Sequence, residues 1–220
     1  MSQSDRIDPW QLADSAFPTG GFAHSWGLEG AWQAGELDAD HLPDLLRQLL
    51  WQTAYGTLPL VTAAHRSADR IDVLDALAQA FLTNPVANRA SRVQGRAFLA
   101  TCARVWPSDA LIDLERRARG LCGHYGPLSG ATLAALCVPL PTAQRLVLYH
   151  TCRGALAAAV RLGIVGSYHA QRLQHECVND LDAVLAQCKM LDEDDLAQTA
   201  PLLDLLQAAH GRLYSRLFQS

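Results

Sequence analysis

The stretch LADSAFPTGGFAHSWGLEGAWQAGEL, residues 12–37, combines a stiff turn with the start of a helix. Pro18 fixes one backbone angle, and the pair Gly20-Gly21 permits positive φ angles. Residues 17–22 are therefore predicted to form a tight, shaped loop.

This loop carries a phenylalanine at each end, and a short helix follows it. We expect the loop to deliver Phe17 and Phe22 to a surface, although such a string is also compatible with phenylalanines that fill the core. The helix is expected to follow Ser25, to include Glu29 and to end at Gly35.

Length and composition restrict the class of protein. The chain has 220 residues, 50% of them hydrophobic, which is enough to bury one sizeable core. We expect one domain over 1–220, with a flexible N-terminus at 1–11. A net charge of -4 and a pI near 6.0 argue against a nucleic-acid binder. Without a signal-like start or a long apolar run, the six cysteines are expected to be reduced thiols in a cytoplasmic protein that does not enter a membrane.

The hydrophobic period is helical nearly everywhere. Residues 42–50 show it most clearly, with leucines spaced by three and four positions along one face: Leu42, Leu45, Leu46, Leu49 and Leu50. No segment alternates apolar and polar residues over the length of a strand. The sequence therefore predicts an all-α fold, a single domain of about nine or ten helices.

Four segments lead to specific expectations. In a helix over 86–105, one side should carry Ala90, Val93, Ala97 and Ala100, and a stripe on a different side should carry Arg89, Arg92 and Arg96. Residues 122–130 are expected to form a glycine-rich junction. The helix 142–162 is rich in small residues, which suits either a central core helix or a subunit contact. The last helix is expected over 202–218, with Leu202, Leu206, Ala209 and Leu213 inward.

No pattern for catalysis is evident. The chain has neither Cys-x-x-Cys nor His-Glu-x-x-His, and no serine lies in a Gly-x-Ser-x-Gly elbow. Cys122 and His124 could bind a soft metal weakly, and a metallohydrolase that uses them is one alternative. We expect no catalytic, cofactor or metal site, and the residues alone indicate a helical interaction protein.

Four blocks, in order along the chain, resemble the urease accessory protein F (UreF) family. The most specific are the first, Phe17-Pro-Thr-Gly-Gly-Phe-Ala-His-Ser25 followed by Gly27-Leu-Glu29, and the last, Leu213-Tyr-Ser-Arg-Leu-Phe-Gln-Ser220. Between them, Arg89–Leu99 is similar to a Gln-Gly-Arg segment of the family, and Tyr149–Leu162 is similar to its small-residue helix with a basic end.

The resemblance implies an all-α, homodimeric chaperone without an active site of its own. Such a protein would bind urease accessory protein D/H, recruit the nickel-carrying GTPase UreG, and through the complex help to insert nickel into the urease apoprotein. It also implies that the tail, residues 212–220, is ordered by a partner.

The residues expected to bind partners are Phe17, Phe22, Glu29, Arg161, His210, Tyr214, Arg216 and Phe218. The alternatives are structural: Glu29 can favour a helix start, Arg161 can complement a helix C-terminus, and His210 can be a core residue. A second functional hypothesis is a GTPase-activating factor for UreG, with Arg161 or an arginine of the 89–96 stripe as the finger.

Overall fold

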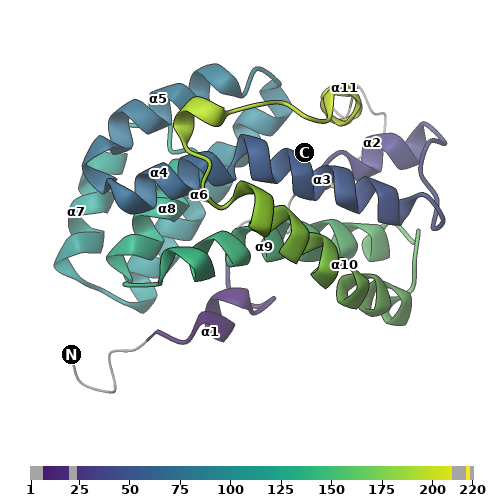
Figure 1. Cartoon of the computed structure of the whole chain (residues 1–220), viewed down its shortest axis with the longest axis horizontal. Coiled ribbons are helices and arrows are strands. Elements are labelled where there is room, and N and C mark those ends of the chain that lie inside the picture. Colours follow the sequence, from purple (N-terminus) through teal and green to yellow (C-terminus); the bar gives the residue numbers. More distant parts are fainter. Residues whose placement is uncertain (1–6, 20–23, 210–216, 219–220) are drawn as a thin grey trace.

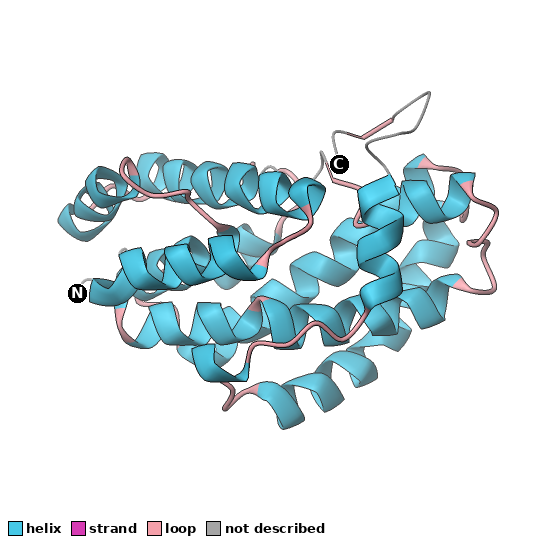
Figure 2. Ribbon diagram, turned by 90° about the horizontal axis from the view of Figure 1, so that it is seen from above, coloured by secondary structure: helices cyan, strands magenta, loops and turns pink. Residues whose placement is uncertain are grey.

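The computed structural model describes residues 7–19, 24–209 and 217–218, and these residues are built from helices (Figures 1 and 2). The α-helices are α1 Pro9–Ala13, α2 Leu28–Gln33, α3 Leu42–Gly56, α4 Leu58–Arg66, α5 Ile71–Phe81, α6 Pro85–Val105, α7 Asp109–Ala118, α8 Tyr125–Ala135, α9 Leu140–Arg161, α10 Ser167–Cys188 and α11 Pro201–Ala209. Short 3₁₀ segments lie at Ala68–Arg70 and Glu193–Asp195. The predicted all-α class is confirmed, and α1 is a helix that the sequence did not indicate.

Two hydrophobic clusters form the core, and α4 and α9 contribute to both. One cluster lies among α2, α3, α9 and α10, and the other lies among α4, α5, α6, α7 and α8. In α4, Val61 packs in the first cluster and Leu60 in the second. In α9, Leu146 packs in the second cluster and Val147 packs in the first. The small-residue helix α9 is thus a central core helix of this chain, as one of the two alternatives proposed.

Glycine allows α8 to pack directly against α4. A Cβ atom at Gly130 would lie 2.3 Å from the carbonyl oxygen of Val61, so only glycine permits this approach. Almost every residue of α8 is buried, including the polar Ser129 and Thr132. Helix α8 starts at Tyr125, and the junction that was expected over 122–130 is therefore shorter than predicted.

Helix α11 differs from its prediction. It begins at Pro201 and its described part ends at Ala209, and residues 217–218 form a bend instead of continuing it. Leu202, expected inward, is 71% exposed, whereas Leu203 is buried. Leu206 packs against the first core cluster, as expected, and the inward face of α11 thus carries Leu203 and Leu206, where the helix packs against the glycine side of α2. Leu213 lies outside the described residues.

Helix α6 buries only Ala90 of the four apolar residues that were expected to share one side. Val93 is 43% exposed, while the polar residues Asn88 and Gln94 are buried together with Gly95, Phe98 and Leu99. This face packs on α8 and on the loop before it, so polar and small residues are selected there. None of the helices in the described parts of the chain is long and apolar enough to cross a membrane.

Candidate functional site

The first and last blocks of the sequence meet in space, although 188 residues separate them. The Glu29 carboxylate accepts a hydrogen bond from the backbone N–H of Leu217 at 2.6 Å and one from that of Phe218 at 3.2 Å. The Phe218 side chain is buried in the first core cluster. We call Glu29, Arg161 and the segment 217–218 the tail seat.

Two unusual backbone conformations place Glu29 in this position. Trp26 has a φ of 57° and Gly27 has a φ of 85°, so the chain turns sharply before α2. At Gly30, an added Cβ would lie 2.5 Å from the carbonyl oxygen of Leu206, so this glycine allows α2 and α11 to touch. Figure 1 shows α2 and α11 at one end of the molecule. The carboxylate of Glu29 is therefore carried on a helix that α11 holds in place.

Arg161 completes the seat from the C-terminal end of α9. Its guanidinium carbon lies 4.2 Å from the centre of the Phe218 ring, a cation–π contact. Trp26 fits close to α9 because residue 154 is glycine, where a Cβ would lie 2.9 Å from the indole nitrogen. The tail is thus held by three elements at once: α2, α9 and the turn before α2.

Of the eight predicted partner-binding residues, the structure brings three together: Glu29, Arg161 and Phe218. It does not bring Phe17 to a surface. Phe17 is buried in the second cluster and stacks on Trp106 at a centroid distance of 5.6 Å, so the expected exposure of this side chain is wrong. The core-filling alternative holds for Phe17, because Trp106 and Phe98 offer it an aromatic pocket.

The other four predicted residues, Phe22, His210, Tyr214 and Arg216, lie outside the described residues. Within the segment expected to be flexible, residues 9–11 belong to α1, which Asp8 caps by accepting a hydrogen bond from the N–H of Trp10. Within the tail, the two described residues contact this chain itself.

Large apolar side chains are exposed on the elements that form the seat. Trp32 on α2 is 44% exposed, Leu202 and Leu205 on α11 are 71% and 67% exposed, and Leu217 is 52% exposed. Since α2 and α11 pack together, these residues give this end of the molecule an apolar surface.

A second buried carboxylate holds the loop before α8. Asp75 of α5 accepts hydrogen bonds from the backbone N–H groups of Cys122, Gly123 and His124, at distances of 2.6 to 3.2 Å. Gly95 lets α6 lie against this loop, since its Cβ would be 2.4 Å from the Gly123 carbonyl oxygen. From here on, the term junction means Asp75 together with residues 122–125.

The junction does not offer the metal site that Cys122 and His124 suggested. His124 is fully buried, and its ring nitrogens face Gln79 Oε1 at 2.9 Å and Ser91 Oγ at 3.2 Å. Burial lowers the pKa of His124, and Asp75 opposes that effect only in part. In the parts of the chain that the structure covers, His, Cys, Asp and Glu form no group of three that could hold a metal ion.

The arginine stripe on α6 is partly structural. Arg96 donates a hydrogen bond to the carbonyl oxygen of Leu121 at 3.2 Å, and its side chain lies against Gly123. Sequence reasoning missed Asp75 and Leu217. Asp75 carried a signal, because it lies four positions after Ile71 on the apolar face of α5.

Comparisons with known proteins show the family to which this chain is related. The family model described as UreF matches residues 37–178. The chain is 39% identical over 219 residues to urease accessory protein F of Arabidopsis thaliana, an alignment that covers 96% of this chain and 91% of the relative. It is 36% identical over 225 residues to urease accessory protein F of Oryza sativa subsp. indica, covering 99% and 86% of the two chains.

A bacterial relative is similar over the same length. Urease accessory protein UreF of Mycobacterium tuberculosis (strain ATCC 25177 / H37Ra) is 32% identical over 212 residues, covering 95% of this chain and 96% of its own. The three relatives align over 95–99% of this chain, and the residues that the family model matches include Arg161. This chain therefore belongs to the UreF family of urease accessory proteins.

Proposed function

We propose that this chain is a non-catalytic adaptor in urease maturation. It binds accessory protein D/H, recruits the GTPase UreG, acts as a homodimer, and so aids nickel insertion into the urease apoprotein. The observation that carries the proposal is the tail seat, because it gathers Glu29, Arg161 and Phe218 beside exposed apolar side chains. Family membership supports the same role.

The composition of the seat suits protein binding. Interfaces obtain most of their affinity from a few aromatic, arginine and apolar anchors that are shielded from water. Arg161 and Leu217 are exposed and lie next to a buried aromatic ring, so a partner can cover them without unfolding the body. A partner that covers Leu217 would also exclude water from the Glu29 hydrogen bonds and strengthen them.

The buried polar groups elsewhere support a structural role. Asp75 holds backbone N–H groups, His150 Nε2 lies 3.0 Å from the Leu12 carbonyl oxygen, and Arg153 donates to the Ala13 carbonyl oxygen. These groups fix loops to helices, and in none of these contacts does a base face a nucleophile.

The test is capture of this chain by immobilised accessory protein D/H. Deletion of residues 212–220 should abolish capture and leave the helical circular-dichroism signal largely unchanged. Leu217→Asp places a charge on the exposed part of the seat and should weaken capture at least tenfold. Val73→Asp is the matched control, because Val73 is 55% exposed on α5 and its substitution should leave capture unchanged. Full capture by the deletion variant would refute the role of the tail.

Arg161 distinguishes the adaptor from a GTPase-activating factor. An arginine finger raises phosphoryl transfer by roughly 10³ to 10⁵, whereas a binding anchor changes affinity only. We expect Arg161→Ala to weaken assembly with UreG and to leave single-turnover GTP hydrolysis in the saturated complex unchanged. Arg172→Ala, at an exposed arginine on α10, is the control. A fall in hydrolysis at saturation with Arg161→Ala alone would favour the activating factor.

A further inference from the structure

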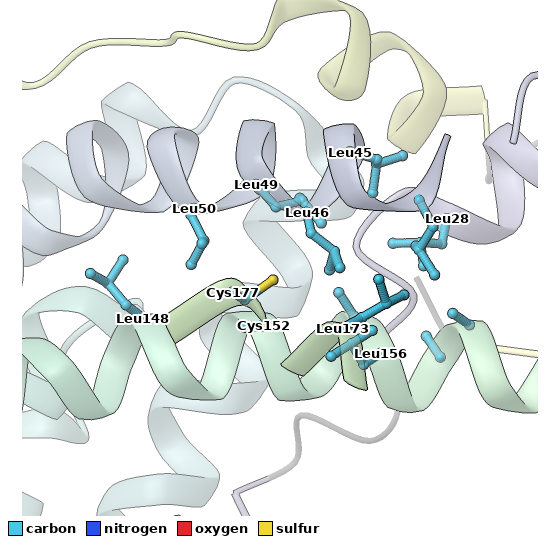
Figure 3. Packing of buried hydrophobic residues seen from close by; sticks show 14 of the residues in the cluster. Leu28, Leu45, Leu46, Leu49, Leu50, Leu148, Cys152, Leu156, Leu173 and Cys177 are labelled. Atoms are coloured by element: carbon cyan, nitrogen blue, oxygen red, sulfur yellow. The ribbon is translucent and has the colours of Figure 1, made fainter. Parts of the chain in front are cut away.

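The helical hairpin of α9 and α10 places two free thiols opposite one another. Buried residues at equal distances from the turn pair across the hairpin: Ala159 with Ala170, Leu156 with Leu173, Cys152 with Cys177, and Leu148 with Leu181. Both cysteine side chains are buried in the first core cluster and line the same hollow. Figure 3 shows both cysteines among the leucines of α3, α9 and α10.

The two thiols differ in acidity. The neighbouring Cys152 thiol lowers the pKa of Cys177, and Arg47 on α3 acts in the same direction. Burial and the nearby acidic groups Asp180 and Glu176 oppose this effect. The pKa of Cys152 is raised, because it keeps the shared proton and is itself buried. Cys177 is therefore the nucleophile of the pair and Cys152 is the thiol that can resolve it.

A small molecule can approach the pair from one side of the hairpin. A hollow between the helices is lined by Cys152 and Cys177 and is flanked by Arg145, Gln174 and His175. The other buried thiols are protected by their surroundings: burial raises the pKa of Cys102 to about 12 and also raises the pKa of Cys188. Among these buried thiols, Cys152 and Cys177 thus lie close to each other and can be reached by a small molecule through the hollow.

We infer that Cys152 and Cys177 form a reversible oxidation site whose substrate is hydrogen peroxide. The Cys177 thiolate attacks one peroxide oxygen, the O–O bond breaks, and hydroxide leaves and takes up a proton, so that Cys177 becomes a sulfenic acid. The Cys152 sulfur then attacks the Cys177 sulfur, the S–O bond breaks, and a second water leaves. Two thiols and one peroxide thus yield one disulfide and two waters. Two molecules of a reducing thiol then return both cysteines to thiols by disulfide exchange and are themselves joined as a disulfide.

The disulfide would connect α9 to α10 within the core. A bridge requires the two Cα atoms to lie within about 7 Å of each other, and small buried residues on α9, Ala155 and Ala159, favour a close approach of the two helices. The bridge closes the loop between residues 152 and 177, which restricts the unfolded chain. The oxidised form should therefore unfold at a higher temperature than the reduced form.

The experiment treats the full-length chain with hydrogen peroxide, alkylates the remaining thiols and maps the peptides by mass spectrometry. We expect a peptide pair joined through Cys152 and Cys177, alkylation of the other four of the six cysteines, and full reversal by dithiothreitol. In Cys152→Ser the joined pair should be lost, and a sulfenic-acid reagent should label Cys177. The control Cys137→Ser removes an exposed cysteine and should form the bridge as the wild type does.

Several results would overturn the inference. Six alkylated cysteines after peroxide treatment, a bridge between any other two cysteines in preference to this pair, or direct conversion of Cys177 to sulfinic acid without a bridge would each do so. The wild-type peptide map decides the question even if a variant fails to fold. Loss of urease maturation is not a readout here, so the result is independent of the proposed function.

Discussion

The tail seat and the junction use the same chemistry for different purposes. In each, one buried carboxylate accepts hydrogen bonds from consecutive backbone N–H groups: Glu29 from residues 217–218, and Asp75 from residues 122–124. The junction is enclosed by three helices of the body. The tail seat holds a segment next to the chain end, with Leu217 half exposed. The Asp75 carboxylate fixes a loop between helices, whereas the Glu29 carboxylate fixes residues 217–218, where an apolar side chain stays half exposed.

The largest effect on stability is expected when the Asp75 carboxylate of the junction is removed. Asp75→Ala leaves three buried N–H groups without their acceptor, and we expect it to lower the free energy of unfolding by about 3–5 kcal/mol. Urea denaturation followed by circular dichroism measures the change. Asp72→Ala, at an exposed aspartate on the same helix, should change it by less than about 0.5 kcal/mol. If both variants lose the same stability, the junction is not what holds this part of the body.

Substitutions of two tightly packed glycines, Gly95 and Gly30, should affect stability and partner capture to different degrees. Gly95→Ala brings a Cβ to 2.4 Å from the Gly123 carbonyl oxygen, and we expect it to cost about 2–3 kcal/mol of unfolding free energy. Gly30→Ala meets the Leu206 carbonyl oxygen at 2.5 Å and should displace α11, with about 1 kcal/mol lost but capture by protein D/H strongly reduced.

Urea denaturation and the capture assay separate the two glycine effects. Gly166→Ala is the control, because an added Cβ there meets no atom within 4 Å. If Gly30→Ala proved the more destabilising of the two and left capture intact, the comparison between the regions would be reversed.

Acid should lower the free energy of unfolding, because His150 and His124 are buried. Burial lowers the pKa of His150 to about 4 and also lowers that of His124, so both bind protons more readily in the unfolded chain. Their contribution to stability is fully present above about pH 6.5 and is lost as the pH falls toward 4. For His150 we expect a loss of about 1–2 kcal/mol between pH 7 and pH 5.

The unfolding free energy measured by urea at several pH values tests this expectation. His150→Gln should flatten the profile between pH 7 and pH 5, because the substituted side chain does not titrate. A variant profile that is as steep as that of the wild type would show that other groups cause the acid sensitivity.

The smallest expected effect on stability comes from the tail seat. Glu29→Gln keeps one acceptor oxygen but presents an NH₂ group to the second backbone N–H, so we expect a local cost of about 1 kcal/mol. Hydrogen exchange at Leu217 and Phe218 should accelerate roughly fivefold, with little change in global unfolding. Glu36→Gln, at an exposed glutamate, is the control. Unchanged exchange in Glu29→Gln would mean that the carboxylate does not hold the tail.

Sequence reasoning was accurate where a pattern is local. The leucine spacing at 42–50 gave the buried face of α3, and the helix expected over 86–105 is α6, Pro85–Val105, where the Asn84 side chain accepts a hydrogen bond from the N–H of Val86. It failed in part for α6 and α11, whose buried faces depend on the glycines and carbonyl groups of other helices. It also failed for Phe17, because the aromatic pocket formed by Trp106 and Phe98 comes from the far end of α6.

The sequence by itself determined the helical class and the family, and it singled out the first and last motif blocks. Periodicity and short motifs are properties of neighbouring residues, and so they can be read without coordinates. Only the tertiary structure decided that those two ends meet, that Glu29, Arg161 and Phe218 form one seat, and that Asp75 carries a loop. The reason is that each of these contacts joins residues tens to nearly two hundred positions apart, and their pairing depends on how the helices pack.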